Sequence, residues 1–346
     1  MIIRKYNKPW IKLLKNKRVF VTGGTGSFGN FFVQEVLKYN PKQIVIFSRD
    51  EDKQHSMQEE LSHYSKVLRF VIGDVRDKEC LIKALSGGVD IFVHAAALKQ
   101  VPTAEYNIFE AVKTNVLGAQ NVVDACLACG VKKAVTISTD KAVEPVNVYG
   151  MTKAISERIF VLGNKYKNGG WTRFGVVRYG NVMGSRGSIL RVFKRQMEKG
   201  GPFTLTHQEM TRFTITLAEA INLTFIALSN IKGGEVFVPK LATLRIKDLA
   251  EVFIEELKPK DKRIIEIGIR PGEKLHETLI TPTERSRTIE KSDYFMILPE
   301  IGIEGFNRKY PKYKLVSDQV ARYSSNNGRH LTKKEIRELL RKENLI

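Results

Sequence analysis

A glycine-rich turn near the start of the chain constrains the fold more than any other feature of the sequence. A short apolar run, 18-RVFVTG-23, leads into 22-TGGTGSFG-29, where Gly23, Gly26 and Gly29 stand at three-residue intervals. Glycines in this pattern permit a tight turn and let backbone N–H groups at a helix N-terminus approach a pyrophosphate. A purely structural strand–helix turn is the alternative. The turn is not a Walker A phosphate loop, because no Gly-Lys-Ser/Thr follows it.

Beyond this turn, short apolar runs alternate with longer amphipathic stretches as far as about residue 180. The runs are near-continuously apolar, which is typical of parallel strands buried on both faces. Their ranges are 18–23, 43–48, 68–74, 90–96, 133–139 and 173–180. Helix-period segments separate them, for example 28–39 and a long one at 105–129. The alternation predicts an α/β fold with a doubly wound parallel sheet of the Rossmann type.

Looser patterning after residue 180 predicts a smaller α+β domain. Glycine and proline punctuate this part, as in 199-KGGPF-203 and 270-RPGEK-274. We expect residues 1–180, completed by part of 211–240, to form the dinucleotide-binding domain. Residues 181–346 are then expected to form a discontinuous substrate-binding domain over the carboxyl ends of the strands.

The formal net charge of +20 over 346 residues raises the question of nucleic-acid or membrane partners. The excess is local, because residues 1–18 carry +7, residues 151–200 carry +9 and residues 301–346 carry +6. No aromatic-plus-basic RNA motif accompanies it, so we expect no nucleic-acid partner. Weak contact of the two basic ends with an anionic membrane surface is a hypothesis.

Several classes of protein are excluded by what the sequence lacks. No apolar run approaches the ~18–20 residues of a membrane span, and no signal-peptide pattern is found. The three cysteines, Cys80, Cys126 and Cys129, fit neither a disulfide framework nor a four-ligand metal site. His207 and His276 are isolated, so we expect no metal. These observations predict a cytoplasmic protein without a transmembrane segment.

The end of the second apolar run bears on the choice of dinucleotide. It reads Ser48-Arg49-Asp50, and Lys53 follows shortly after. A carboxylate at this point takes the ribose hydroxyls of NAD, whereas cations accommodate the 2′-phosphate of NADP. Arg49 and Lys53 favour NADP, Asp50 supports NAD, and a solvated helix start would also explain both cations. Further predicted contacts at the ends of the third and fourth runs are Asp74, Val75 and Ala95.

A candidate acid–base site lies in 136-TISTDKAVEPVNVYGMTKA-154. Tyr149 and Lys153 form Tyr-x-x-x-Lys at the start of a helix, which puts both side chains on one face. An ammonium beside a tyrosine lowers the pKa of the hydroxyl, so that it serves as a base at neutral pH. Ten residues upstream stand Thr139, Asp140 and Lys141, at the strand end where α/β folds place their chemistry. A local surface ion pair is the alternative for Asp140 and Lys141.

With these motifs together, the chain resembles the extended short-chain dehydrogenase/reductase superfamily over nearly its whole length. The narrower resemblance is to the inverting UDP-N-acetylglucosamine 4,6-dehydratases that open pseudaminic-acid biosynthesis. It is carried by 22–29, 48–51, 95-AAALKQVP-102, 139–141 with Tyr149, 178-RYGNVMGSRGS-188, 211-TRFTITLAEA-220 and 268-GIRPGEKLHE-277. Retaining dehydratases have Thr-Asp-Glu where this chain has Thr139-Asp140-Lys141. A related epimerising group has Met in place of Tyr149.

The resemblance implies a mechanism. Tyr149 would take the proton of the sugar 4-hydroxyl while a hydride leaves C4 for the nicotinamide. Lys141 would abstract the C5 proton, and for this it must be neutral, a state that we expect from partial desolvation near Lys153. Asp140 would protonate the departing 6-hydroxyl, and Thr139 would hold the 4-oxygen. Hydride return to C6 and protonation of C5 from the opposite face would invert C5, with NADP tightly bound and regenerated at each turnover.

The resemblance also implies the ligand contacts. UDP-N-acetylglucosamine would be the substrate, and its diphosphate needs cations and amide donors. The implied substrate contacts are Lys99, Thr139, Asn181, Arg186, Arg270 and, near the uridine ribose, Glu273. The implied cofactor contacts add Thr25, Ser27, Phe28, Ser48, Lys99, Tyr149 and Lys153. Asn181 as a turn cap and Arg270 paired with Glu273 are the structural alternatives.

Other functions remain open on the sequence. A 4-epimerase or a C5-retaining dehydratase of the same superfamily is the runner-up, although an epimerase does not need an Asp-Lys pair after Thr139. A hypothesis from another functional class is a sugar-nucleotide sensor or an RNA-binding protein that has an enzyme fold but no longer has catalytic activity. The intact set from Thr139 to Lys153 argues against it. The superfamily also implies a homo-oligomer.

Overall fold

The computed structural model describes residues 8–166, 171–185, 187–300, 310 and 322–346. Within them a nine-stranded sheet runs in the order β14-β15-β10-β6-β5-β4-β1-β2-β3. Its strands are β1 (Arg18–Thr22), β2 (Gln43–Ser48), β3 (Leu68–Ile72), β4 (Ile91–His94), β5 (Lys133–Thr139), β6 (Arg173–Tyr179), β10 (Val236–Pro239), β14 (Thr288–Glu290) and β15 (Tyr294–Ile297). β15 is antiparallel to both of its neighbours, β14 and β10, and all the other neighbouring strands of this sheet pair in parallel. The order from β3 to β6 is that of a doubly wound dinucleotide fold, which confirms the predicted fold class.

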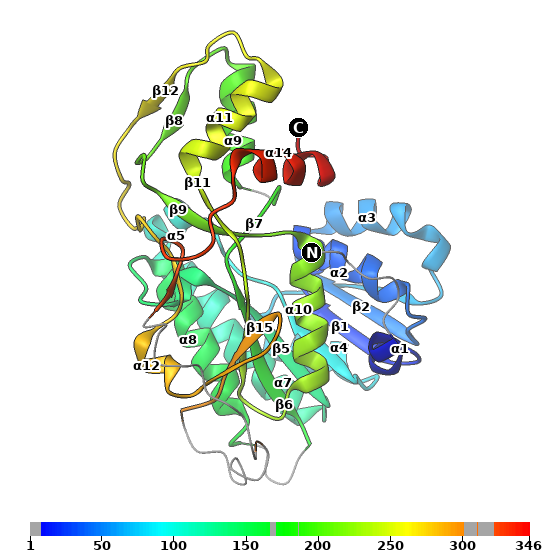
Figure 1. The fold of residues 1–346 in the computed structure, drawn as a ribbon. Helices are drawn as coiled ribbons and strands as arrows, with labels where there is room; N and C mark the ends of the chain where they lie inside the picture. Colours follow the sequence, from blue (N-terminus) through cyan, green and yellow to red (C-terminus); the bar gives the residue numbers. More distant parts are fainter. Residues whose placement is uncertain (1–7, 167–170, 186, 301–309, 311–321) are drawn as a thin grey trace.

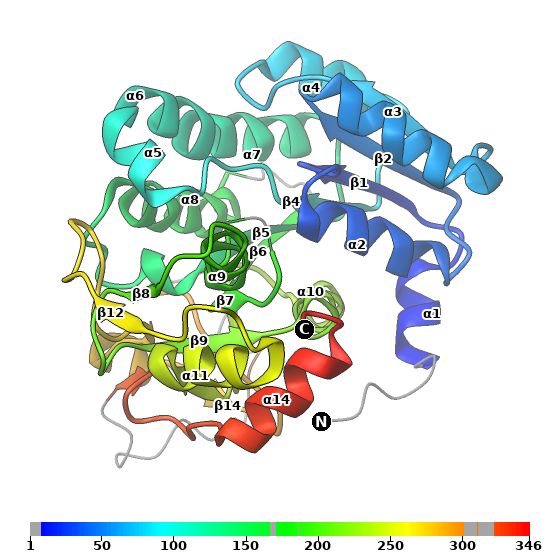
Figure 2. The same ribbon diagram turned by 90° about the horizontal axis from the view of Figure 1, so that it is seen from above.

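Helices cover both faces of this sheet (Figures 1 and 2). One face carries α4 (Lys78–Leu85), α7 (Gly118–Ala128) and α8 (Val148–Gly163), and the other carries α2 (Ser27–Leu37) and α10 (Leu217–Asn230). Side chains alternate accordingly along β1. Val19 and Val21 pack with the α2 and α10 side, whereas Phe20 packs with the other side and stacks on Phe92 at 4.9 Å between ring centroids. Burial on both faces explains why the strands read as continuous apolar runs.

The predicted helix over 105–129 is broken in the structure, so this part of the sequence reading is wrong in detail. α5 (Val101–Tyr106) and α6 (Ile108–Ala111) meet at Asn107, whose φ of −132° and ψ of 55° are not helical. A π-helical stretch then covers Val112–Leu117 before α7 begins. It turns Asn115 inward, where the side-chain amide accepts from Leu98 N at 2.8 Å and donates to Leu98 O at 2.9 Å. This tertiary contact holds the loop after β4. Helical periodicity in the sequence does not predict such a contact.

A second core lies in the upper part of the molecule in Figure 1. It is built from α9 (Ile189–Glu198), β8 (Phe203–Leu205), α11 (Ile246–Leu257) and α14 (Lys333–Lys342). Phe193, Phe203 and Phe253 pack there with ring centroids 5.5–5.9 Å apart. The division at residue 180 stays a prediction. The large sheet itself extends beyond it, because β10, β14 and β15 come from the second half of the chain.

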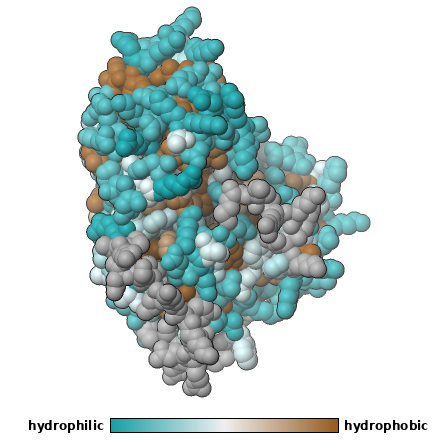
Figure 3. Space-filling view, in the orientation of Figure 1, coloured by the Kyte–Doolittle hydropathy of each residue, from teal (hydrophilic) through white to brown (hydrophobic). Residues whose placement is uncertain are grey.

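The remaining elements are distributed along the chain. The helical ones are α1 (Lys8–Leu14), α3 (Glu51–Glu60), α12 (Pro282–Arg285) and the 3-10 turns Ser62–Tyr64 and Asp140–Ala142. The strands are β7 (Asn181–Val182), β9 (Thr211–Ile215), β11 (Thr243–Arg245), β12 (Ile264–Glu266), β13 (Thr278–Ile280) and β16 (Tyr323–Ser324). In the view of Figure 3, hydrophilic side chains cover most of the described surface, as expected for a chain with 27% charged residues.

Candidate active site

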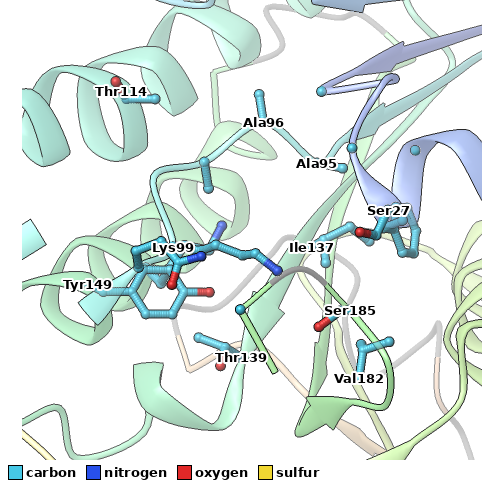
Figure 4. Close-up of a pocket in the computed structure, with 18 of the residues that line it drawn as sticks. Ser27, Ala95, Ala96, Lys99, Thr114, Ile137, Thr139, Tyr149, Val182 and Ser185 are labelled. Atoms are coloured by element: carbon cyan, nitrogen blue, oxygen red, sulfur yellow. The ribbon is translucent and has the colours of Figure 1, made fainter. Parts of the chain in front are cut away.

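A cavity of about 580 Å³ lies at the carboxyl ends of the central parallel strands. The glycine turn after β1 and the ends of β2, β3, β4, β5 and β6 line it together. The predicted residues at its wall are Gly23, Thr25, Gly26, Ser27, Phe28, Gly29, Ser48, Arg49, Asp50, Lys53, Asp74, Val75, Ala95, Lys99, Thr139, Lys141, Tyr149, Lys153 and Asn181. Figure 4 shows Ser27 and Ala95 on one side of the cavity and Tyr149 and Thr139 on another. The predicted cofactor residues thus share one cavity with all the predicted acid–base residues except Asp140, which is not at the wall.

The glycine turn has the shape that a pyrophosphate requires. Gly23 has a φ of +65°, and a Cβ there would lie 2.8 Å from Ala96 N. A Cβ on Gly26 would meet only Gly23 O, at 3.1 Å, so that it would fill open space beside the cavity. α2 begins at Ser27, and no side chain caps its N-terminus. Its first N–H groups therefore offer donors and a partial positive charge for an anion. The residues present fit a dinucleotide.

After the end of β2, Asp50 has a structural role of its own. It caps α3 by accepting from Lys53 N at 3.0 Å, and its other oxygen pairs with the Lys53 ammonium. The Arg49 guanidinium is half-exposed and lies 3.3 Å from Asp74. The pKa of Asp74 is held below its usual value by Arg76 and Arg49, against the opposing effect of burial. A guanidinium therefore stands at the cavity rim, where a phosphate could meet it.

β5 ends in the predicted acid–base group. Thr139 Oγ1 donates to Asp140 Oδ1 at 3.0 Å, and Lys141 Nζ lies 3.0 Å from the same oxygen. Asp140 is fully buried, and its Oδ2 has no hydrogen-bond partner among the described residues. The pair is thus an interior ion pair beside the cavity, and the alternative of a surface pair is not what the structure shows.

α8 brings Tyr149 to this group. Its N-cap Asn147 accepts from Gly150 N at 2.7 Å, which fixes the first turn. A Cβ on Gly150 would lie 2.2 Å from Lys141 O, so glycine lets the helix start directly against the Asp140–Ala142 turn. Tyr149 lines the same cavity as Thr139 and Lys141. Tyr149, Thr139 and Lys141 therefore face one space, and Asp140 lies buried behind Lys141.

The expected effect of Lys153 on Tyr149 is not seen in the structure. Burial raises the pKa of Tyr149 to about 12, and the cation that opposes this rise is Lys141. Burial also lowers the pKa of Lys153 to about 8, although nearby Glu157 opposes that shift. The prediction that Lys153 depresses the pKa of Tyr149 was wrong, because Lys153 is not among the groups that shift this pKa and burial outweighs the effect of Lys141.

The expectation of a neutral Lys141 is also corrected. Asp140 and Glu277 raise the pKa of Lys141 well above its usual value, against the opposing effects of burial and Arg212. Lys153 is not among the groups that shift it. Lys141 Nζ lies 3.2 Å from Glu277 Oε1 as well as 3.0 Å from Asp140 Oδ1. Two carboxylates therefore hold the amine as an ammonium.

Glu277 is the residue that sequence reasoning missed. It precedes β13, its side chain is 2% exposed, and it reaches Lys141 from the second half of the chain. Glu277 is the last residue of the 268–277 segment, which the sequence analysis had singled out. The sequence did not indicate that its side chain contacts Lys141. Only the packing of β13 on the Asp140–Ala142 turn brings the carboxylate to the site.

The predicted substrate contacts fall into three groups. Lys99, Thr139 and Asn181 line the cavity. Arg186 lies outside the described residues. Arg270 and Glu273 lie away from the cavity wall, on an exposed turn where Arg270 N donates to Glu273 Oε2 at 3.3 Å. Their contact with a uridine diphosphate stays a prediction.

Neither a metal site nor a membrane span is found in the described part of the chain. It contains no group of three or more His, Cys, Asp or Glu side chains arranged to hold a metal ion. None of its helices has the length and apolar character needed to cross a membrane.

The fold and the site together define an extended short-chain dehydrogenase/reductase fold with a dinucleotide-shaped cavity. Residues 19–299 match the family described as Polysaccharide biosynthesis protein, and the chain belongs to that family.

Curated relatives cover nearly the whole chain. An inverting UDP-N-acetylglucosamine 4,6-dehydratase from Campylobacter jejuni is 42% identical over 95% of this chain and 98% of its own. A UDP-glucose 4-epimerase from Rickettsia typhi is 40% identical over 94% of this chain and 95% of its own. A protein of Methanocaldococcus jannaschii named as an uncharacterized membrane protein is 46% identical over 94% and 96%.

Solved structures agree on the fold. Pen from Bacillus thuringiensis superposes with a TM-score of 0.88 at 38% identity, over 96% of this chain and 99% of its own. The dTDP-glucose 4,6-dehydratase DesIV from Streptomyces venezuelae, solved with NAD bound, gives a TM-score of 0.68 over 75% and 86%. At 22% identity, this second likeness shows the fold alone.

Proposed function

We propose that the protein is a UDP-N-acetylglucosamine 4,6-dehydratase that inverts C5. Its product would be a UDP-2-acetamido-2,6-dideoxy-β-L-arabino-hex-4-ulose. The observation that supports the proposal is the Asp140–Lys141 ion pair directly after β5, in which Asp140 is buried and Lys141 lines the cavity together with Tyr149. The 42% identity to an inverting enzyme of this name supports it.

The proposed cofactor is NADP, held through the whole cycle. The glycine turn and the start of α2 would hold the pyrophosphate, and Lys153 and Tyr149, which also line the cavity, would contact the nicotinamide half. Arg49 and Lys53 would meet the 2′-phosphate, since Asp50 is engaged in capping α3. When bound, the cofactor supplies reversible hydride transfer, from C4 at the start and to C6 at the end.

The chain's own residues would move the protons. Tyr149 would accept the proton of the 4-hydroxyl as a phenolate, and Thr139 would hydrogen-bond the 4-oxygen. Because burial raises the pKa of Tyr149 to about 12, its own phenol proton must leave first. The resulting ketone acidifies C5–H. Lys141 takes that proton, the C5–C6 double bond forms, the C6–O bond breaks, and the leaving oxygen takes the proton of Asp140 and departs as water. Protonation of C5 from the face opposite to the one that Lys141 deprotonates would give the inverted product.

The ion pair in the structure is compatible with these roles. An amine and a carboxylic acid hold the same number of protons as an ammonium and a carboxylate. Proton transfer over the 3.0 Å between Lys141 Nζ and Asp140 Oδ1 therefore prepares the base and the acid in one step. No exchange with solvent is needed.

A UDP-sugar 4-epimerase is the second candidate, and a C5-retaining dehydratase of the superfamily is the third. The epimerase is favoured by the relative of that name at 40% identity. An epimerase needs hydride removal and return at C4 but no elimination at C5 and C6. The Asp140–Lys141 pair would then have no chemical task.

Incubation with UDP-N-acetylglucosamine in D2O separates these candidates. The inverting dehydratase is expected to give a 4-keto-6-deoxy sugar with deuterium at C5 and the opposite configuration there, as read by NMR. A C4 epimer with hydrogen retained at C5 would establish the epimerase. A deoxy product with unchanged C5 would establish the retaining dehydratase.

Replacing Arg49 tests the cofactor. Arg49→Ala is expected to weaken NADP binding by about tenfold, because one charge-assisted contact to a phosphate is lost, while NAD binding changes little. Fluorescence titration of the apoprotein with both reduced cofactors measures the ratio. An equal loss of affinity for NADP and NAD would show that Arg49 has a structural role. Unchanged affinity for both would show that Arg49 does not contact the cofactor.

Three broader expectations also stay proposals. A homo-oligomer is supported by exposed apolar side chains on neighbouring helices, namely Ile108, Phe109, Leu117, Met151 and Ile155. A monomeric mass by light scattering would contradict it. A cytoplasmic location is the second of these proposals. The third is weak contact of the basic ends with anionic membranes, and a liposome co-sedimentation assay that shows no binding at low salt would contradict it. Residues 1–7 of the first basic end lie outside the described residues.

A further inference from the structure

A buried cluster of charges connects the acid–base pair to the second half of the chain. Glu277 Oε1 lies 3.2 Å from Lys141 Nζ and 3.9 Å from Arg212 Nε, and Glu277 Oε2 lies 3.9 Å from Lys274 Nζ. All these side chains are at most 20% exposed. The cluster thus has two carboxylates, on Asp140 and Glu277, and three cations.

The backbone around Glu277 is held from both sides. Glu277 N donates to Ser325 Oγ at 2.9 Å, and Ser325 N donates back to Glu277 O at 2.8 Å. Ser324 Oγ donates to the same carbonyl at 3.0 Å. The carboxylate is therefore presented to Lys141 by a rigid support. Its Oε2 nevertheless has no hydrogen-bond partner among the described residues.

We propose that Glu277 is a positioning residue for the proposed dehydration, holding the Lys141 side chain against Asp140 and keeping its proton within the pair until the sugar is bound. Glu277 touches neither the cavity wall nor, in the mechanism above, a reacting atom. It acts through Lys141. The inference rests on the proposed function for its chemical meaning.

The geometry explains why two carboxylates serve better than one. If Lys141 passes a proton to Asp140, the neutral amine still has two N–H bonds, and Glu277 Oε1 at 3.2 Å accepts one of them. The lone pair is then left for the C5 proton. With Asp140 alone, the amine would be free to rotate about its last bonds, and it would lose its proton to solvent more readily.

Charge balance supports the same role. An ammonium in the interior is strongly disfavoured unless carboxylates face it. The groups that face Lys141 are Asp140 beside it, Tyr149 on α8, Arg212 on β9, and Lys274 and Glu277 ahead of β13. Arg212 and Lys274 repel the ammonium, so removal of the Glu277 charge would leave Asp140 alone against two cations.

Competitive acetylation measures this effect without any turnover. Trace acetic anhydride reacts with the neutral form of an amine, and mass spectrometry of the Lys141 peptide at a series of pH values gives the midpoint of its reactivity. Nα-acetyl-lysine in the same tube is the reference. Wild-type Lys141 is expected to react at a higher pH than the reference. In Glu277→Gln the midpoint is expected to fall by about one pH unit or more.

Two variants serve as controls. Glu277→Asp keeps the charge and is expected to recover at least half of the shift. Glu284→Gln removes another buried carboxylate, which pairs with Arg178 at 2.9 Å, and should leave the midpoint of Lys141 unchanged. An unchanged midpoint in Glu277→Gln overturns the proposal, as does an equal shift in Glu284→Gln. If Glu277→Gln does not fold, a wild-type midpoint at or below the reference overturns it instead.

Kinetics then separate the two proposals. If the wild type dehydrates UDP-N-acetylglucosamine, Glu277→Gln is expected to lower kcat by at least about tenfold at little change in KM, and to move the alkaline limb of the kcat profile to lower pH. A wild type with no dehydratase activity but a shifted acetylation midpoint would remove the proposed function and keep the Lys141–Glu277 coupling. An active wild type whose kcat is unaffected by Glu277→Gln would keep the proposed function and remove the positioning role of Glu277.

Discussion

Lys141→Met is expected to abolish dehydration while leaving cofactor binding intact. The variant keeps the length of the side chain but removes the amine that is proposed to take the C5 proton. Loss of a general base lowers turnover by roughly 10²–10⁴-fold. NADP binding should persist, because the glycine turn and the start of α2 lie elsewhere in the cavity. Product formation by NMR and cofactor content by absorbance of the purified protein measure the two quantities.

Stability has to be measured beside activity for this variant. Lys141→Met would leave Asp140 and Glu277 buried without their shared cation, and breaking a buried pair costs about 3–5 kcal/mol. Lys274→Met is the matched control, since Lys274 lies 3.9 Å from Glu277 but is not proposed to react. Folded Lys141→Met protein with normal turnover would remove Lys141 from the role of base. Equal loss in Lys274→Met would show that the cluster's charge, rather than this amine, is what matters.

The glycine turn and the strand ends of the cavity could be predicted from sequence because their determinants are local. A glycine turn requires glycine within a few residues of a strand, and β5 delivers Thr139, Asp140 and Lys141 as consecutive residues. Strands buried on both faces leave an apolar run that can be read directly. The Tyr149–Lys153 spacing could be recognised for the same reason, because the two residues are close in sequence on one helix.

The charge state of the site could not be predicted, because it depends on contacts between distant segments. Lys141 and Glu277 are 136 positions apart, and their approach follows from how β13 packs on the turn after β5. A sequence shows that Lys141 has an aspartate neighbour but not that a second carboxylate faces it. The break at Asn107 has a similar origin, since the π-helical stretch serves the contact of Asn115 with Leu98. Local periodicity carries no trace of either.

Gly26→Ala and Gly29→Ala are expected to fail in opposite ways. A Cβ on Gly29 would lie 2.4 Å from Gly23 O and 2.5 Å from Gly24 Cα, so the helix start and the turn would have to separate. Overpacking of this kind costs about 1–3 kcal/mol, and the variant should unfold at a lower temperature. Gly26 has φ −72° and ψ 170°, which alanine adopts readily, and its Cβ would meet a single atom at 3.1 Å. Alanine at this N-cap costs about 1 kcal/mol at most.

The cofactor separates the two glycines further. The Cβ of Gly26→Ala would occupy the space through which backbone N–H groups approach a pyrophosphate, so NADP affinity is expected to fall by about tenfold or more, equivalent to about 1.4 kcal/mol. Thermal unfolding without cofactor, and the rise of the midpoint on adding NADP, measure fold and binding in one experiment. Gly26→Ala should show a smaller rise with a midpoint close to wild type in the absence of cofactor, whereas Gly29→Ala should lower the midpoint in the absence of cofactor. A full NADP-induced rise in Gly26→Ala would show that the dinucleotide does not lie against this turn.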